Sequence, residues 1–145
     1  VPVGSGSGLS GACIVAKAVN PAIRVIGVQS SAAPAAYESW KAGSIVCLEN
    51  NTIAEGLSTG EGFALPQHIL AEHLDDFILV SDEEIQQAMV WLLECAHTLA
   101  EGAGAASLAA LWQHRAEWQN RKIGIVCSGG NVSVANLKKA LAVTD

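Results

Sequence analysis

The stretch VPVGSGSGLSGACIVAKAV (residues 1–19) decides the fold, because four glycines between positions 4 and 11 separate an apolar start from a helical pattern. Residues 1–3 are predicted to end a strand. Apolar residues at helical spacing then predict a helix over residues 9–19. Each glycine costs about 0.5–1 kcal/mol relative to alanine in regular structure. The backbone must therefore turn tightly here, or pass close to another group.

The remaining chain alternates β-branched runs with helical patterns. The nearly continuous apolar run IRVIGVQ is typical of a parallel strand that is covered on both faces. The sequence predicts one domain over residues 1–145, with an α/β fold in three layers: a mostly parallel sheet flanked by helices. The predicted strands are 23–29, 45–49, 77–80 and 123–127. The predicted helices are 31–43, 66–74, one that begins with a Ser81–Glu84 capping box, 104–118 and 132–142.

Composition excludes several classes of protein. The net charge is −6 without a basic cluster, so nucleic acid is not an expected partner. No uncharged apolar run approaches the roughly 20 residues that span a membrane, and no cationic leader precedes the opening. The four cysteines form no CxxC pair, which favours free thiols in a reducing cytoplasm. We expect Cys13, Cys95 and Cys127 to be buried, since each lies within an apolar pattern.

A strand, a glycine loop and a helix together form an arrangement that binds phosphate through backbone N–H groups and the helix dipole. Three sites are conceivable. The segment Gly6–Gly11 satisfies the dinucleotide pattern G-x-G-x-x-G, but Gln29-Ser30-Ser31 stands where the ribose-binding acid is required. A P-loop is excluded, because no Gly-Lys-Ser/Thr follows the glycines. A monophosphate cofactor needs only the loop and the helix.

The stretch KIGIVCSGGNVS (residues 122–133) repeats the order of strand, glycine turn and helix. Two such turns at the carboxyl edge of one sheet favour a ligand held between them. Two ordinary strand–helix turns would leave the same pattern, and spacing alone leaves both interpretations open.

Six motifs together resemble the threonine dehydratase and serine racemase family of pyridoxal-phosphate enzymes (fold type II), and most closely its catabolic threonine dehydratase branch. The resemblance covers nearly the whole chain and implies pyridoxal 5'-phosphate as cofactor and an amino acid as substrate. The motifs are VPVGSGSGLSG, IRVIGVQS, TIAEGL, VSDEEI, EGAGAASLAAL and NRKIGIVCSGGN.

The resemblance also implies which residues bind the cofactor. Its phosphate would lie on Gly4, Ser5, Gly6 and Ser7, with Gly8 adjoining, although the family usually has four consecutive glycines and then a bulky apolar residue. Ser128 would hydrogen-bond the pyridine nitrogen.

Two further positions match the surroundings of the family's pocket, namely Gly56 and Glu101. Glu55 stands where aspartate is usual. The family's cation-binding positions correspond to Gln29 and Ala35, which are not anionic ligands, and the four histidines show no metal spacing. We therefore expect no metal site.

The family's Schiff-base lysine lies in a Ser-x-Lys segment before the glycine loop, and none of the five lysines here has that context. We therefore expect a C-terminal part of a threonine/serine ammonia-lyase that carries the phosphate loop but no catalytic lysine, without the small substrate-binding domain. Such a chain would be inactive alone. A non-catalytic binding or assembly module of the same fold is the alternative, with a dinucleotide-binding domain less favoured. A mean hydropathy of +0.33 suggests exposed apolar surface and hence a homo-oligomer.

Overall fold

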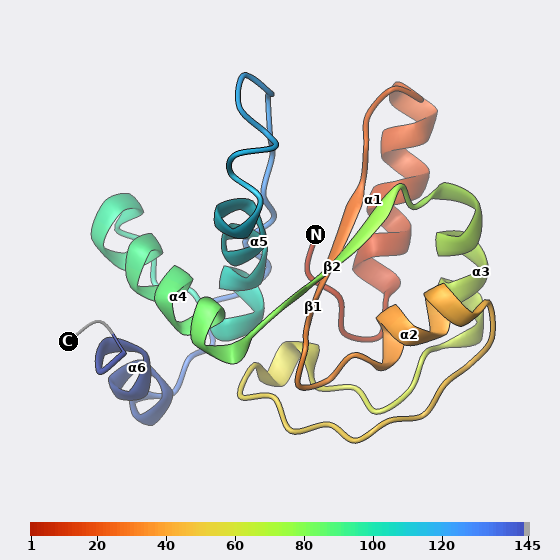
Figure 1. Cartoon of the computed structure of the whole chain (residues 1–145). Helices are drawn as coiled ribbons and strands as arrows, with labels where there is room; N and C mark the ends of the chain where they lie inside the picture. Colours follow the sequence, from red (N-terminus) through yellow and green to blue (C-terminus); the bar gives the residue numbers. More distant parts are fainter. Residues whose placement is uncertain (144–145) are drawn as a thin grey trace.

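A computed structural model of the chain describes residues 1–143 and has two parallel strands between two groups of helices (Figure 1). Strand β1 (Ile26–Ser30) pairs with β2 (Asp76–Val80), and the register runs from Ile26 opposite Asp76 to Ser30 opposite Val80. On the other edge of β1, Pro2 forms a parallel bridge with Val28, as expected for residues 1–3. The helices are α1 (Ser7–Val19), α2 (Ala35–Ala42), α3 (Ala64–His73), α4 (Asp82–Ala96), α5 (Gly102–Gln113) and α6 (Val134–Leu141), with a 3-10 turn over Glu55–Leu57.

Each face of the sheet has its own apolar core, because side chains alternate along a strand. Phe77 packs with Leu9 and Leu70 under α1 and α3. Its neighbour Ile78 faces the opposite way, toward α5, in a core that also contains residues of α4. Gly27 permits the first packing, since a Cβ atom there would lie 2.9 Å from the Leu9 side chain. The chain therefore has helix, sheet and helix layers, as predicted.

The predicted helices form, with bounds shifted by a few residues. Helix α4 begins with the predicted capping box: Ser81 Oγ accepts from the Glu84 N–H, and the Glu84 carboxylate accepts from the Ser81 N–H. Helix α2 ends at Gly43 in the left-handed conformation (φ 66°), as expected of a glycine cap. Helix α3 is longer than the predicted turns over residues 66–74.

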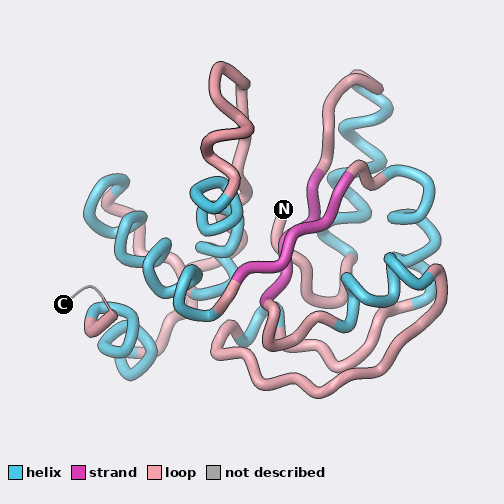
Figure 2. The backbone as a smooth tube through the Cα atoms, viewed as in Figure 1, coloured by secondary structure: helices cyan, strands magenta, loops and turns pink. Residues whose placement is uncertain are grey.

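Two predicted strands are wrong. Residues 45–49 contribute only an isolated bridge between Cys47 and Glu61, within the long loop that follows α2 (Figure 2). Residues 123–127 have no regular structure and are exposed. The β-branched pattern of IGIVC is typical of a strand, but a strand needs a neighbour to pair with, and no strand of the described residues lies beside this segment. Exposure also corrects the cysteine prediction: Cys13 is buried, whereas Cys95 and Cys127 are exposed.

Membrane spanning receives no support from the helices. Helix α4 has 15 residues, and none of the helices within residues 1–143 has both the length and the apolarity of a bilayer span.

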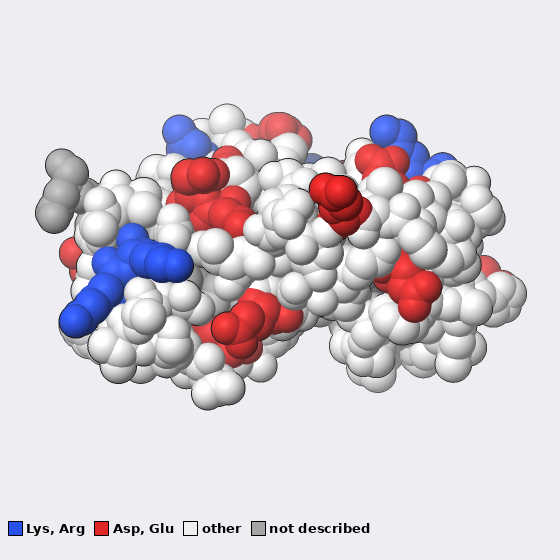
Figure 3. Space-filling view, turned by 90° about the horizontal axis from the view of Figure 1, so that it is seen from below, with Lys and Arg blue, Asp and Glu red and all other residues white. Residues whose placement is uncertain are grey.

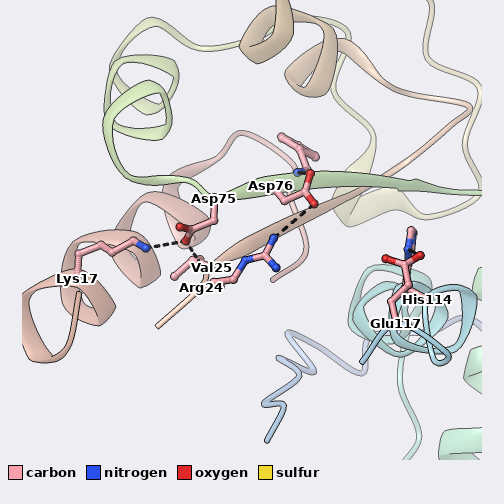
Figure 4. Close-up of polar contacts among 8 residues, drawn as sticks. Lys17, Arg24, Val25, Asp75, Asp76, His114 and Glu117 are labelled. Carbon is pink, nitrogen blue, oxygen red and sulfur yellow. Dashed lines mark hydrogen bonds and ion pairs between the residues drawn. The ribbon is translucent and has the colours of Figure 1, made fainter. Parts of the chain in front are cut away.

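An ion pair joins the starts of both strands to α1 (Figure 4). The Asp75 carboxylate accepts from Lys17 Nζ at 2.6 Å and from the Val25 N–H at 2.7 Å. Burial alone would raise the pKa of Asp75, but the hydrogen bonds from Lys17 and Val25 and the charges of Lys17 and Arg24 lower it below its usual value.

Replacing Asp75 by Asn should remove part of the acid sensitivity of folding. A carboxyl group with a lowered folded-state pKa stabilises the fold above its unfolded pKa of about 3.9, and this contribution disappears as the pH falls through the folded value. Urea unfolding between pH 7 and pH 3 should therefore show a smaller loss of stability in Asp75→Asn than in the parent chain. Asp76→Asn is the control, because the Asp76 carboxylate accepts only from the N–H of its chain neighbour Phe77 at 2.8 Å and has a 3.8 Å ion pair with exposed Arg24, and neither contact reaches α1. Equal pH profiles for Asp75→Asn and the parent would contradict this account.

Candidate functional site

The glycine loop lies at the carboxyl edge of the strands, where it begins α1. Gly6 is the N-cap of α1 and has φ +94°, a conformation that favours glycine, and no side chain caps the helix. A Cβ atom at Gly6 would also lie 2.8 Å from the Pro66 side chain. Both reasons that the sequence suggested for the glycines therefore apply at Gly6, since the backbone turns tightly there and also passes close to another group.

The neighbouring loop residues are open. Ser5, Ser7 and Gly8 are exposed, and a Cβ atom at Gly8 would meet nothing within 4 Å. The first N–H groups of a helix have no intrahelical acceptor, and here no side chain supplies one. The loop thus presents donors and a positive dipole end in an accessible place, which fits a phosphate group.

Close backbone contacts bring the other predicted residues toward this loop. A Cβ atom at Gly4 would collide with the carbonyl oxygen of Gly56, and one at Gly56 would lie 2.7 Å from the Ala103 Cβ and 3.8 Å from the Glu101 carboxylate. A Cβ atom at Gly129 would collide with that same carboxylate. Gly4, Gly56, Glu101 and Gly129 are therefore consecutive neighbours in space, although they are distant in sequence.

Ser128 is placed by the residue that follows it. The Gly129 carbonyl accepts from the Glu101 N–H at 3.1 Å, which ties the turn to the beginning of α5. The Ser128 side chain is exposed and has no hydrogen-bond partner within residues 1–143. Its hydroxyl is therefore available to a ligand at this edge.

Glu101 lies at the N-cap position of α5, yet its side chain accepts no capping hydrogen bond. Its carboxylate instead lies beside Gly56 and Gly129. The ordinary role of a carboxylate at a helix start therefore does not account for its conformation.

Sequence reasoning missed the role of Asp82, which it treated only as a charge at the start of a helix. The Asp82 carboxylate accepts from Ser30 Oγ at 2.8 Å, from Thr52 Oγ1 at 2.6 Å and from the Ile53 N–H at 2.8 Å. These bonds attach the segment before Gly56 to β1 and α4. Its only sequence signal is a Thr and a Ser at element ends, which is too common to be specific.

The positions considered for a metal have other environments. Gln29 is fully buried; its Oε1 accepts from the Tyr37 N–H at 3.1 Å, and its Nε2 has no partner in residues 1–143. The described residues contain no group of three or more His, Cys, Asp or Glu that could bind a metal ion.

Figure 3 shows the face of the molecule on which the strands end. The Lys and Arg side chains visible there lie toward its margins, and the largest group is at the end where α6 lies, which carries Lys138 and Lys139. An anion at the glycine loop would accordingly depend on backbone donors and hydroxyls more than on cationic side chains.

The family model described as pyridoxal-phosphate dependent enzyme matches residues 1–129. A strand, an exposed glycine loop that begins a helix and a second glycine turn at one sheet edge agree with that match. The chain belongs to the family of pyridoxal-phosphate dependent enzymes, which confirms the resemblance and favours the monophosphate interpretation of the loop over the dinucleotide one.

Three related proteins show which members of the family this chain is similar to. The chain is 36% identical over 135 residues to the L-threonine ammonia-lyase of Thermotoga maritima, a match that covers 92% of this chain and 33% of that protein. It is 34% identical to the catabolic L-threonine dehydratase of Escherichia coli K12, and this match covers 100% of this chain and 45% of that protein. Serine racemase of Dictyostelium discoideum is 38% identical to the chain, and the match covers 97% of this chain and 44% of that protein. The chain therefore spans less than half the length of these relatives.

Solved structures confirm the fold class. The crystal structure of a T.th. threonine deaminase matches with a TM-score of 0.86 at 34% identity and covers 92% of this chain and 45% of that one. The structure of maize serine racemase matches with a TM-score of 0.84 at 34% identity, and the match covers 99% of this chain and 47% of that chain. The predicted α/β fold of type II is thus correct.

Replacing Asp82 by Ala should loosen the segment that holds Gly56. Hydrogen bonds to a charged group contribute about 1.5–3 kcal/mol each, and the loss leaves three partly buried donors unpaired, so we expect destabilisation by about 2 kcal/mol or more. Urea unfolding measures the loss, and limited proteolysis should show earlier cleavage between residues 50 and 60. Glu83→Ala, which removes an exposed carboxylate from the same helical turn, is the control. Equal stability of the two variants would refute the role assigned to Asp82.

Proposed function

We propose that this chain forms the phosphate-binding and ring-binding side of a pyridoxal-phosphate dependent ammonia-lyase that acts on threonine or serine. The observation that carries the proposal is the uncapped start of α1 at an exposed glycine loop, with Gly56, Glu101 and the turn at Ser128 gathered along the same edge. The names of the relatives, threonine ammonia-lyase and serine racemase, support the substrate class.

In this proposal the loop residues Gly4, Ser5, Gly6 and Ser7 bind the phosphate through backbone N–H groups, and Gly8 leaves the approach open. The hydroxyls of Ser5 and Ser7 add donors that glycines would lack. Ser128 hydrogen-bonds the ring nitrogen with a neutral hydroxyl, so the protein does not impose a protonated ring. The bound cofactor supplies an electron sink for substrate carbons, which suits elimination of water from a hydroxy amino acid.

We further propose that residues 1–145 are part of the large domain and are inactive alone. The cofactor aldehyde needs a lysine, and the lysines of this chain have other positions. Lys17 pairs with Asp75, Lys41 lies 5.5 Å from the Tyr37 ring centroid, and Lys122 is exposed within the irregular segment between α5 and α6. The remaining two, Lys138 and Lys139, are in the last turn of α6.

We also propose that the chain self-associates and that it resides in a reducing cytoplasm. Several large apolar side chains are exposed, among them Val15, Val19 and Leu65 at 62%, 75% and 71%. Exposed free thiols such as Cys95 and Cys127 suit a compartment that keeps cysteines reduced.

Calorimetric titration of the chain with pyridoxine 5'-phosphate tests the phosphate loop, since this analogue lacks the aldehyde that could react with surface lysines. We expect saturable binding that Gly8→Asp weakens at least tenfold, because a carboxylate there repels phosphate while its Cβ meets nothing within 4 Å. Gly11→Asp is the matched control: it is also exposed and unobstructed, but one turn further along α1. Equal weakening by both variants, or binding of NAD in place of the analogue, would overturn the assignment.

The chain alone should not deaminate threonine. With pyridoxal phosphate and threonine present, we expect no 2-oxobutanoate above the rate given by free cofactor in a coupled dehydrogenase assay. The serine assay, with pyruvate as product, should give the same result. Turnover that Lys→Ala replacement at one of the five lysines abolishes would refute the proposed inactivity and identify the aldehyde-binding lysine.

A further inference from the structure

The peptide group between Gly4 and Ser5 can face either way in the glycine loop. Before it, Val3 is fully buried, and its N–H donates to the Val28 carbonyl at 2.8 Å. After it, Gly6 is buried and begins α1. Gly4 has no Cβ atom to restrict rotation, so this peptide is able to turn either its N–H or its carbonyl toward an approaching anion. Its direction therefore depends on the contacts of its carbonyl.

Thr59 supplies such a contact. Its hydroxyl Oγ1 donates to the Gly4 carbonyl at 3.3 Å. Because the peptide bonds of the loop are trans, the Ser5 N–H points opposite to the Gly4 carbonyl and away from Thr59. Ser5 is exposed, and its N–H donates to no acceptor within residues 1–143. The contact thus leaves a donor on the open side of the loop.

The peptide group between Gly6 and Ser7 is held in the same way. The Gly6 carbonyl accepts from the Ser10 N–H at 2.9 Å, which is the first hydrogen bond of α1. The Ser7 N–H therefore points out of the helix start. Within the described chain, both peptide groups have their carbonyls engaged and their N–H groups without an acceptor. Backbone N–H groups directed in this way form the concavities that bind anions.

The position of Thr59 is itself fixed. Its N–H donates to the Leu57 carbonyl at 2.9 Å, and Leu57 is 1% exposed. Asp82 attaches the chain before this turn to α4 through its hydrogen bond with Thr52. In Figure 1 the Glu55–Leu57 turn, drawn in yellow, lies at the same end of the strands as the start of α1. The hydroxyl therefore reaches Gly4 from a base that two independent contacts hold.

We propose that Thr59 is a positioning residue for phosphate binding: its hydroxyl holds the Gly4 carbonyl away from the anion and directs the Ser5 N–H toward it. This role rests on the proposed binding of phosphate at the glycine loop. Without the hydroxyl, the peptide has to be oriented during binding, which lowers the affinity. The β-branched side chain of threonine has few rotamers, which suits a donor that keeps one direction.

Two substitutions at Thr59 test the hydroxyl. Thr59→Val removes it with little change of shape, whereas Thr59→Ser keeps it. In titrations with pyridoxine 5'-phosphate, Thr59→Val should bind about three- to tenfold more weakly than the parent chain, which corresponds to the loss of one neutral hydrogen bond. Thr59→Ser should bind as the parent does. Ser58→Ala is the matched control, since the neighbouring Ser58 hydroxyl bonds to the Asn50 side chain and not to the loop.

Amide NMR separates this positioning from a general loosening of the turn. Pyridoxine 5'-phosphate and inorganic phosphate, added separately, should each shift the Ser5 and Ser7 amide resonances of the parent chain. In Thr59→Val the shift should persist at Ser7 and diminish at Ser5. In the free Thr59→Val chain, the heteronuclear NOE of the Ser5 amide should fall, while those of Ser7 and Leu57 stay unchanged.

Equal binding by Thr59→Val and the parent, or equal weakening by Ser58→Ala, would overturn the proposal. A loss confined to pyridoxine 5'-phosphate, with inorganic phosphate bound as before, would assign the Thr59 hydroxyl to the ring and would overturn it as well. If the parent chain binds neither probe, the proposed function fails. The Ser5 NOE of the free chain then still decides whether Thr59 orients this peptide, and an unchanged value in Thr59→Val refutes it.

Discussion

The parallel ladder of Val1–Val3, β1 and β2 determines where chemistry can occur in this chain. Parallel strands end at one edge, so the turns that follow them meet there. The glycine loop follows the first strand, the Ser30 and Gln29 positions end the second, and Ser81 begins α4 after the third. One pattern of backbone hydrogen bonds thus gathers groups that are more than 70 residues apart.

Close packing of backbone, more than side-chain chemistry, holds these turns together. Gly4 touches the Gly56 carbonyl, Gly129 touches the Glu101 carboxylate, and a Cβ atom at Gly104 would collide with the Gly129 carbonyl. A side chain at any of these positions would separate two segments. The tolerance of Gly8 for a Cβ atom shows the opposite case, in which an open position leaves room for a ligand.

Local patterns predicted most of the helices because their signals are contained within one segment. The Ser81–Glu84 capping box needs only neighbours in sequence and forms as expected, and the cap at Gly43 is equally local. The strand at 123–127 required a partner from elsewhere, and sequence alone could not show that none of the described residues supplies it. Asp82 could not be found for a similar reason, since its three donors lie 29 to 52 residues away. Glu101 and Gly56 came from the family resemblance rather than from spacing.

The turn that carries Ser128 is attached to the glycine-loop edge from one side. Ser128 is held on its C-terminal side, where Gly129 accepts from the Glu101 N–H and Gly130 lies against the Leu99 carbonyl. On its N-terminal side, residues 122–127 have no backbone partner within the described chain. The Ser128 hydroxyl therefore lies at the boundary between a turn that backbone contacts attach to α5 and a segment that is exposed. Its position relative to the glycine loop depends on the contacts of Gly129 and Gly130, because these are the contacts that tie the turn to the sheet edge.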